Sequence, residues 1–470
     1  MQARLTRREA LRIAPASVVA LASAQTSTSQ GDSEITVRVT AGSKRFAEQA
    51  ALRWQPDRGP SSQSITVDPS KSYQEMLGFG AALTDAACYM FNQLPPARRE
   101  ELFHTLFHPS AMSLSVCRIC IGSSDYATRP YSFDEGEPDP KLQRFSIDHD
   151  REYIIPILKQ ARNVNPELFL LASPWSPPGW MKANNSMLGG CIRKRYFPVY
   201  ARYFSKFLQA YAEAGVPVNA VTVQNEVDTD QDGRMPASLW GQEYEMEFVA
   251  AHLGPQLKKD GINAKIWILD HNYNLWGRAI CELDDPEVNR YVDGIAWHGY
   301  VGEPSAMTRV HDAHPGKHAY WTEGGPDIQS RRYATDWAEW SATFTGILRN
   351  WARCIIGWNL ALDEAGKPNI GPFSCGGIVT INSQSKEITQ SGMYAAFSHY
   401  SRAVRRGARR IASDGDLQSV SHTAFVNPDQ TQVTILTNSG DQKSVALRSS
   451  GKQTQVNLPS DSITTLTWRS

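Results

Sequence analysis

Two glutamates stand at the ends of strand-like runs and could together carry out acid–base and nucleophilic chemistry. Ala220–Gln224 alternates β-branched residues as a buried strand does, and the pair Asn225-Glu226 follows it directly. A second such run, His318–Thr322, leads into Glu323 and two glycines. Hydrolysis of a glycosidic bond needs two carboxyl groups, one protonated to assist the leaving group and one ionised to attack the anomeric carbon or activate water. A lone glutamate at a strand end is more often a salt-bridge partner, but two such ends favour a catalytic pair.

Strands and helices alternate through the middle of the chain, which indicates a parallel sheet with crossover helices. Helical patterns such as Tyr200–Tyr211 and Tyr244–Lys259 separate eight predicted strands. The predicted strands are Leu77–Thr84, Ser115–Ile121, Leu168–Pro174, Val218–Gln224, Ala264–Leu269, Gly294–His298, Ala319–Thr322 and Cys354–Leu360. Eight such units predict an α/β fold of the (β/α)8 TIM-barrel type, whose active site forms at the carboxyl ends of the strands. Glu226 then ends the fourth strand and Glu323 the seventh, across one barrel mouth.

Both ends of the chain have the texture of β-structure. Alternating runs at Ile35–Thr40 and Ser64–Val67 precede the first predicted helix, and further runs separated by turn residues follow the last one. Those later runs are Ala424–Val426, Gln432–Thr437, Lys443–Leu447 and Ser462–Trp468. We therefore expect a β-sandwich side domain built from both termini. The expected organisation is a linker at 25–34, N-terminal strands of the side domain at 35–70, the barrel at 71–405 and the C-terminal part of the side domain at 406–470.

Residues 1–24 have the features of an export signal of the twin-arginine type. Arg7 and Arg8 precede a modest apolar stretch, Ile13–Leu21, and Ala22-Ser23-Ala24 supplies an A-x-A cleavage site. The alternative is an amphipathic cytoplasmic tail. The interpretation as a signal predicts an exported protein, periplasmic or extracellular.

Charge and cysteine content narrow the classes of partner. Lys+Arg and Asp+Glu number 48 each, so no net field favours nucleic acid or anionic lipid. No segment offers about twenty uncharged apolar residues, so we expect no integral membrane segment. Cys117 and Cys120 have C-x-x-C spacing but lie in a predicted strand, where residues three apart point to opposite faces, which disfavours a metal or redox site. Seven cysteines cannot all pair, and the sequence leaves open both one disulfide and the oligomeric state.

Four motifs, in order along the chain, resemble glycoside hydrolase family 30, the family of the glucosylceramidases. They are Gly78-Phe-Gly-Ala-Ala-Leu-Thr-Asp85, Ser173-Pro-Trp-Ser-Pro-Pro-Gly-Trp180, Asn225-Glu226 and Trp321-Thr-Glu323. The resemblance implies a (β/α)8 barrel with a β-sandwich side domain, and a retaining mechanism without metal or organic cofactor. It also implies that Glu226 is the general acid/base, with a raised pKa, and that Glu323 is the nucleophile.

The same resemblance implies six substrate-binding residues. Asn225 matches an amide that binds the sugar 2-hydroxyl, although it could instead cap the turn after its strand. Asp85 matches a residue that holds the far hydroxyls of the sugar, and its alternative role is to cap the helix that follows. The remaining four are Trp175, which like Asp85 matches a residue that holds the far hydroxyls, Trp358, at the floor under the sugar, and His298 and Tyr300, near the nucleophile.

The expected substrate is a carbohydrate or glycolipid. The resemblance favours a β-glucosidase of the glucosylceramidase type. An endo-β-1,6-glucanase or a xylan or xyloside hydrolase on the same scaffold is the alternative, and a non-catalytic carbohydrate-binding protein is a third. The paired glutamates argue against the last of these, because a binding protein does not need both.

Overall fold

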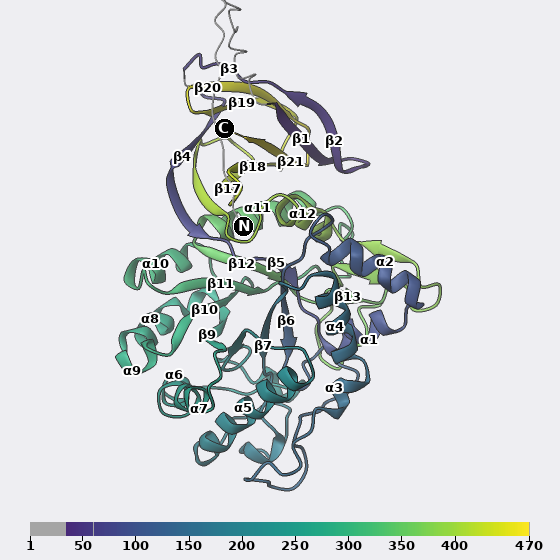
Figure 1. Ribbon diagram of the computed structural model, residues 1–470, viewed down its shortest axis with the longest axis vertical. Helices are drawn as coiled ribbons and strands as arrows, with labels where there is room; N and C mark the ends of the chain where they lie inside the picture. The colour runs from purple at the N-terminus through teal and green to yellow at the C-terminus, as the bar shows by residue number, and fades with distance from the viewer. Residues whose placement is uncertain (1–33, 60, 470) are drawn as a thin grey trace, which may run out of the picture. The chain divides into compact units, whose positions relative to one another are not determined.

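The computed structural model describes residues 34–59 and 61–469 (Figure 1). The predicted export signal at 1–24 and all but the last residue of the predicted linker lie outside the described residues. Within the described part of the chain, no helix is both long and apolar enough to cross a membrane. All seven cysteines fall in that part, and each is unpaired.

The predicted barrel is confirmed: eight parallel strands form one sheet, in the order β5-β12-β11-β10-β9-β8-β7-β6. Their bounds are β5 (Gly78–Ala81), β6 (Val116–Cys120), β7 (Phe169–Ser173), β8 (Ala220–Thr222), β9 (Lys265–Asn272), β10 (Val292–His298), β11 (His318–Glu323) and β12 (Ala352–Gly357). Ser115 N–H donates to Phe79 O at 2.9 Å and Leu83 N–H donates to Arg118 O at 2.7 Å. These two bonds join β5 to β6 and close the barrel.

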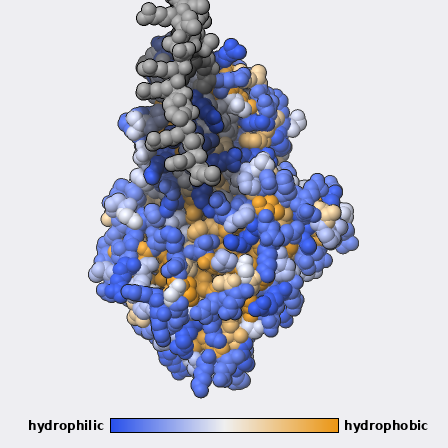
Figure 2. Space-filling view, in the orientation of Figure 1, coloured by the Kyte–Doolittle hydropathy of each residue, from blue (hydrophilic) through white to orange (hydrophobic). Residues whose placement is uncertain are grey.

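Helices separate the barrel strands along the chain. They are α1 (Asp85–Asn92), α2 (Pro96–Phe107), α3 (Asp148–Glu152), α4 (Ile154–Val164), α5 (Phe197–Glu213), α6 (Gln242–Glu247), η4 (Phe248–Leu253), α7 (Gly254–Lys259), α8 (Trp276–Asp284), α9 (Pro286–Asn289), α10 (Ser305–Ala313), α11 (Trp337–Arg349) and α12 (Gly392–Ser401). In α5 the buried residues Phe197, Tyr200, Phe204, Phe207 and Tyr211 recur every three or four positions and form one apolar stripe. Hydrophilic residues cover most of the face seen in Figure 2, as expected for helices that bury one stripe.

The side domain combines strands from both ends of the chain, which confirms the predicted architecture. Its ten strands run in the order β2-β1-β21-β18-β17-β16-β4-β19-β20-β3. The N-terminal strands are β1 (Ile35–Ala41), β2 (Lys44–Leu52), β3 (Gln55–Pro56) and β4 (Ser64–Glu75). The C-terminal strands are β16 (Arg409–Asp414), β17 (Val420–Val426), β18 (Thr431–Asn438), β19 (Lys443–Ser449), β20 (Lys452–Leu458) and β21 (Ser462–Arg469). The sequence analysis did not predict β2, β3, β16 and β20.

The side domain packs against α11 and α12 (Figure 1). Trp337 Nε1 donates to Asp461 O at 2.8 Å, and the two ring nitrogens of His399 each lie 2.8 Å from a threonine hydroxyl, of Thr40 and of Thr465. His399 is fully buried, and burial lowers the pKa of its imidazole to about 3. A neutral histidine thus joins the first and last strands of the side domain to a barrel helix.

Gly80 shows how closely β5 and β6 approach. A Cβ atom on Gly80 would lie 1.7 Å from the carbonyl oxygen of Val116, whereas one on Gly316 would have no atom within 4 Å. Glycine inside a strand commonly marks such a backbone approach.

We predict that Gly80→Ala destabilises the protein by about 1–3 kcal/mol or more, because the methyl group forces apart the strands that close the barrel. Urea unfolding followed by circular dichroism measures the change. Gly316→Ala is the matched control and should change the free energy of unfolding by less than about 0.5 kcal/mol. Equal stability of the two variants would contradict the proposed closure.

Candidate active site

Glu226 and Glu323 face one cavity of about 480 Å³ at the carboxyl ends of the barrel strands. Glu323 is the last residue of β11, and Glu226 follows β8 by four positions. The cavity is lined by Asp125, Trp175, Asn225, Glu226, Asp228, Thr229, Gln231, Met235, His271, Asn272, Tyr300, Glu323, Trp358, Phe373 and Cys375. The barrel therefore brings together the two carboxylates that the sequence placed at separate strand ends.

Glu226 has an unusual backbone conformation. Its φ is +56°, in the left-handed region that residues with a Cβ seldom adopt. Two hydrogen bonds hold this segment in place: Glu226 N–H donates to Asp270 O at 3.0 Å, and Asn225 N–H donates to Pro174 O at 2.8 Å. Strained residues that their surroundings hold in place are frequent at functional sites.

Arg118 lies at the centre of the barrel beneath the cavity and is fully buried. Its Nη1 donates to Glu323 Oε2 at 2.5 Å, and its Nη2 donates to Asn225 Oδ1 and to Asp270 Oδ2, both at 2.7 Å. The guanidinium carbon also lies 4.6 Å from the ring centroid of Trp175. One cation thus contacts residues of four other barrel strands or the loops that follow them.

Asp270 is the main partner of Arg118 and sits in a β-bulge. Leu269 and Asp270 both have positive φ, and the pairing of β9 with β10 shifts by one residue there. The Asp270 carboxylate is fully buried and accepts hydrogen bonds from Arg118, Ser173, Thr222, His298 and Thr322. Burial alone would raise the pKa of Asp270, but the charges of Arg118 and His298 and the Thr222 hydroxyl outweigh burial and hold that pKa well below its usual range.

Glu323 receives donors on both of its oxygens. Arg118 binds Oε2, and the Tyr300 hydroxyl donates to Oε1 at 3.0 Å. Hydrogen bonds from a charged donor such as Arg118 are shorter and stronger than those between neutral groups. The geometry suits a carboxylate that attacks as an anion.

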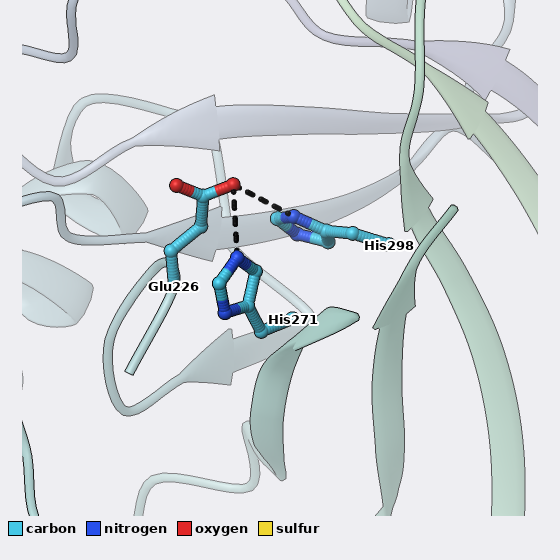
Figure 3. Close-up of side chains that lie close together, drawn as sticks. All are labelled: Glu226, His271 and His298. Atoms are coloured by element: carbon cyan, nitrogen blue, oxygen red, sulfur yellow. Dashed lines mark ion pairs between the residues drawn. The ribbon is translucent and has the colours of Figure 1, made fainter. Parts of the chain in front are cut away.

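Glu226 is held between two histidines, whose rings point at the same carboxylate oxygen (Figure 3). His271 Nε2 lies 3.3 Å and His298 Nδ1 lies 3.4 Å from Glu226 Oε1, while Gln231 Nε2 donates to Oε2 at 2.7 Å. Burial favours a raised pKa of Glu226, but contacts with His271 and His298 outweigh it and lower that pKa. The expected raised pKa is therefore wrong for the protein without substrate.

His271 holds the proton that Glu226 lacks. Its Nδ1 bonds Asp228 Oδ1, and its Nε2 faces Glu226. Burial lowers the pKa of His271, but the two carboxylates outweigh burial and raise it to about 10. His271 and Glu226 together therefore carry one proton at neutral pH.

A limit on the separation of the two carboxylates follows from His298. Its Nδ1 lies 3.4 Å from Glu226 Oε1 and 3.8 Å from Glu323 Oε1, so these oxygens are at most 7.2 Å apart, the sum of the two distances. Retaining glycosidases hold their carboxyl groups about 5–5.5 Å apart, and inverting ones about 6.5–9.5 Å. The limit, which applies to this pair of oxygens, admits the retaining spacing.

Four of the six predicted substrate-binding residues line the cavity: Asn225, Tyr300, Trp175 and Trp358. The two tryptophan rings stack, with centroids 5.1 Å apart and planes inclined by 21°. They form an apolar wall next to Arg118.

The other two predicted residues, Asp85 and His298, do not line the cavity. His298 is fully buried behind Glu226, where it can position the carboxylate but not touch a sugar. The Asp85 carboxylate is occupied by Thr128 N–H at 2.8 Å, His149 Nε2 at 2.6 Å and the Tyr153 hydroxyl at 2.9 Å. The sugar contact of Asp85 stays a prediction. Its alternative role as helix cap belongs to the preceding residue, Thr84, whose hydroxyl accepts from Ala87 N–H.

Asp125 occupies the cavity where Asp85 was expected. It is buried, and burial, followed by the negative charges of Glu323 and Glu226, raises the pKa of its carboxyl group. A protonated or sugar-bound Asp125 does not add a fourth carboxylate charge to those of Glu226, Asp228 and Glu323 in the cavity. The sequence feature that could have predicted Asp125 as a site residue is its position shortly after the second barrel strand, just as Glu226 follows the fourth.

Three further residues escaped the sequence analysis, each with a signal in the chain. Arg118 is a cation inside the otherwise apolar strand β6, Val116–Cys120. Asp270 and His271 lie near the end of the fifth barrel strand, at the same edge as the two glutamates. A charged residue in a buried strand needs a partner of opposite charge or a hydrogen-bond partner. Applied to the predicted strands, this rule would have pointed to Arg118, Asp270 and His271.

The family of the chain follows from comparison with known proteins. Residues 76–404 match the glycosyl hydrolase family 30 TIM-barrel domain, and residues 407–466 match the family's beta sandwich domain. The chain belongs to glycoside hydrolase family 30. It is accordingly a glycoside hydrolase of a family that acts on β-glycosidic bonds.

Relatives of the chain include proteins named as endo-1,6-glucanases and proteins named as glucosylceramidases. The chain is 32% identical over 400 residues to an endo-1,6-beta-D-glucanase of Neurospora crassa, covering 80% of this chain and 82% of that protein. It is 31% identical over 400 residues to a putative glucosylceramidase 1 of Caenorhabditis elegans, covering 80% and 76%. A solved structure described as the endo-beta1,6-glucanase BT3312 is similar with a TM-score of 0.84 and 29% identity, covering 94% of this chain and all of that one.

Lys182 holds two loops of this family 30 hydrolase together beside the cavity. It is fully buried, and its Nζ donates to Ser176 Oγ and Met187 O at 2.9 Å and to Ala237 O at 2.5 Å. Burial lowers the pKa of Lys182 to about 7. Because Met235 lines the cavity two residues before Ala237, Lys182 positions part of the cavity wall.

Lys182→Met should change how stability depends on pH. The unfolded chain keeps a lysine proton up to about pH 10.4, whereas folded Lys182 loses it near pH 7. The unfolded state thus binds more protons in this window, and Lys182 makes stability rise by about 1.4 kcal/mol per pH unit. Urea unfolding at several pH values between 7 and 10 should show this slope reduced in Lys182→Met and kept in the exposed control Lys71→Met. The same pH slope in the native protein, Lys182→Met and Lys71→Met would contradict the lowered pKa of Lys182.

Arg118→Lys keeps the charge but loses the planar fork that reaches three partners at once. We predict that kcat/KM falls about tenfold or more, because Glu323 and Asn225 lose a shared donor. Steady-state kinetics on an aryl β-glycoside measures the loss, with the exposed substitution Arg195→Lys as the matched control. Unchanged kcat/KM in Arg118→Lys would show that the site does not depend on this cation.

Proposed function

We propose that this family 30 enzyme is a retaining β-glucosidic hydrolase in which Glu323 is the nucleophile and Glu226 the general acid/base. The observation that carries the proposal is the different setting of the two carboxylates around one cavity. Glu323 is held by a guanidinium and a phenol, which stabilise an anion. Glu226 is held by the imidazoles of His271 and His298, groups that can exchange a proton with it.

The reaction takes two displacements. The Glu323 carboxylate attacks the anomeric carbon as the bond to the leaving oxygen breaks, and Glu226 gives that oxygen a proton. A covalent glycosyl–Glu323 ester results. Glu226, now ionised, takes a proton from water as the water oxygen attacks the anomeric carbon, which releases the sugar and restores both carboxyl groups.

His271 supplies the proton for the first displacement. In the substrate-free protein the proton lies on the imidazole and Glu226 is ionised. A sugar that fills the cavity removes water from around Glu226 and so raises the pKa of its carboxyl group. The proton then crosses the 3.3 Å contact from His271 Nε2 to Glu226.

The lining residues divide between the faces of the sugar ring. Trp175 and Trp358 give an apolar surface on which the ring can lie, and Asn225, oriented by Arg118, offers an amide to the 2-hydroxyl. Asp125, in place of the expected Asp85, binds the hydroxyls far from the reacting carbon.

β-1,6-Linked glucan is the first substrate that we propose. Relatives named as endo-1,6-glucanases support it, at 32% identity in sequence and a TM-score of 0.84 in structure. Tyr300 and Phe373 line the mouth and are 50% and 43% exposed, so they offer flat surfaces to a second sugar. Glucosylceramide, which the sequence analysis favoured, is the second candidate because a relative named as a putative glucosylceramidase is 31% identical. We also propose export, on the paired arginines of residues 1–24, which would bring the enzyme to polymers outside the cell.

Glu323→Gln should lower kcat on any β-glucoside by about 10⁴-fold or more, because an amide cannot form the glycosyl ester. Glu226→Gln should lose turnover of glucan while retaining much of the first displacement on aryl glucosides whose leaving group needs no proton. Burst kinetics with such an aryl glucoside separates the two variants. Equal activity of Glu323→Gln and the native enzyme would contradict the assignment of the nucleophile.

The substrate is decided by incubating the native enzyme in parallel with β-1,6-glucan, glucosylceramide in detergent and an aryl β-xyloside. Oligosaccharides from the glucan would support the first candidate, and ceramide release the second. Hydrolysis of the xyloside alone would contradict both.

A further inference from the structure

Three potential metal ligands converge in the active site. Among the described residues, Glu226, His271 and His298 each offer one ligand atom, and these atoms all lie within 4.8 Å of one another. Figure 3 shows His271 Nε2 and His298 Nδ1 pointing at the same oxygen of Glu226. Two histidines and one glutamate are a ligand set that zinc uses in enzymes.

Two of the three spacings match a tetrahedral ion. Bonds of about 2.0–2.1 Å at tetrahedral angles place neighbouring ligand atoms about 3.3–3.4 Å apart. Glu226 Oε1 lies 3.3 Å from His271 Nε2 and 3.4 Å from His298 Nδ1. The two imidazole nitrogens lie within 4.8 Å of each other, so an ion that binds all three atoms draws the two rings together by whatever that distance exceeds the tetrahedral spacing.

The second nitrogen of each ring is bound to a carboxylate. His271 Nδ1 bonds Asp228 Oδ1, and His298 Nε2 lies 3.1 Å from Asp270 Oδ1. Carboxylate–histidine pairs of this kind orient the ring and raise its basicity at zinc sites. The remaining nitrogens, His271 Nε2 and His298 Nδ1, therefore both face Glu226 Oε1.

His298 Nδ1 gives an independent indication of a missing ligand. It is a fully buried nitrogen that makes no hydrogen bond within the described structure, and its nearest polar atoms are the carboxylate oxygens Glu226 Oε1 at 3.4 Å and Glu323 Oε1 at 3.8 Å. Such atoms are rare in native proteins. A metal ion would satisfy it.

The local charge also suits a divalent cation. Four carboxylates surround the point, those of Glu226, Asp228, Asp270 and Glu323, and Arg118 is the cation that contacts two of them. With both imidazoles neutral, the group carries three net negative charges. Nitrogen ligands select a transition metal over calcium or magnesium, which prefer oxygen.

We propose that Glu226, His271 and His298 bind one divalent transition-metal ion of the zinc class, and that the bound ion inhibits the enzyme. Glu226 and His271 line the cavity, which supplies a path for the ion and space for water at the fourth position. An ion on Glu226 Oε1 removes the carboxyl group that must give a proton to the leaving oxygen. The ion is therefore an inhibitor and not a cofactor.

Binding is tested without turnover, so its result stands apart from the proposed function. The full chain, freed of metal with a chelator that is then removed, is titrated with Zn²⁺ by calorimetry and with Co²⁺ by visible absorption. We expect one Zn²⁺ per chain and the intense cobalt absorption of a four-coordinate site. His271→Gln should weaken zinc binding by about a hundredfold or more, and Asp228→Asn, which keeps all three ligands, by about 10–100-fold. Hydrolysis by the native enzyme should fall in step with zinc occupancy.

A surface histidine pair provides the matched control. His104 and His108 on α2 stack with ring centroids 4.3 Å apart and could bind zinc independently. The double variant His104→Gln/His108→Gln should keep the core site and its affinity. The proposal is overturned if this control loses the zinc ion, or if His271→Gln and Asp228→Asn, shown to be folded by thermal unfolding, bind zinc as the native protein does.

Discussion

A single buried cation organises the catalytic end of this protein. Arg118 is removed from water inside the barrel, where an unpaired charge would be very costly, so it must be surrounded by anions and acceptors. Those partners are Asp270, Glu323 and Asn225, which belong to or follow β9, β11 and β8. One buried guanidinium therefore brings together residues that lie between 45 and 205 positions apart in the chain.

The barrel provides a rigid frame, and local irregularities in its backbone set the directions in which the site's side chains point. A bulge at Asp270 turns its carboxylate into the interior of the barrel, and the left-handed backbone at Glu226 directs that side chain to the cavity. Each irregularity would be unfavourable alone, and each is held by hydrogen bonds to a neighbouring strand or loop. Glu323 is thereby held against the donors Arg118 and Tyr300, and Glu226 is held against two histidines. The two similar side chains therefore have different surroundings.

The fold and the positions of the proposed catalytic pair were accessible from the sequence because they depend on local patterns. Alternation and strand length located all eight barrel strands, and position at a strand end located Glu226 and Glu323. The edge strand β2 escaped because it carries charged and small residues with little alternation, KRFAEQAAL. Strand β3 has only two residues, and β20, with the sequence KQTQVNL, has only two apolar side chains, so neither gives a clear apolar run.

The finer part of the site depends on tertiary structure. Asp85 and Asp125 both follow barrel strands, and only the folded loops decide that one is enclosed by Thr128, His149 and Tyr153 while the other lines the cavity. The lowered pKa of Glu226 arises from His271 and His298, which are 45 and 72 positions away in the chain and were not linked to it by any pattern.

The central claim is that the cavity holds Glu323 as an anion ready to form a glycosyl ester. The most direct measurement is mass spectrometry of the enzyme after reaction with a 2-deoxy-2-fluoro-β-glucoside carrying an activated leaving group, which forms the ester quickly and hydrolyses it slowly. The account predicts one added fluoroglucosyl group per chain, on the peptide that contains Glu323. A label on another carboxylate, or turnover with no covalent adduct and inversion at the anomeric carbon, would contradict it.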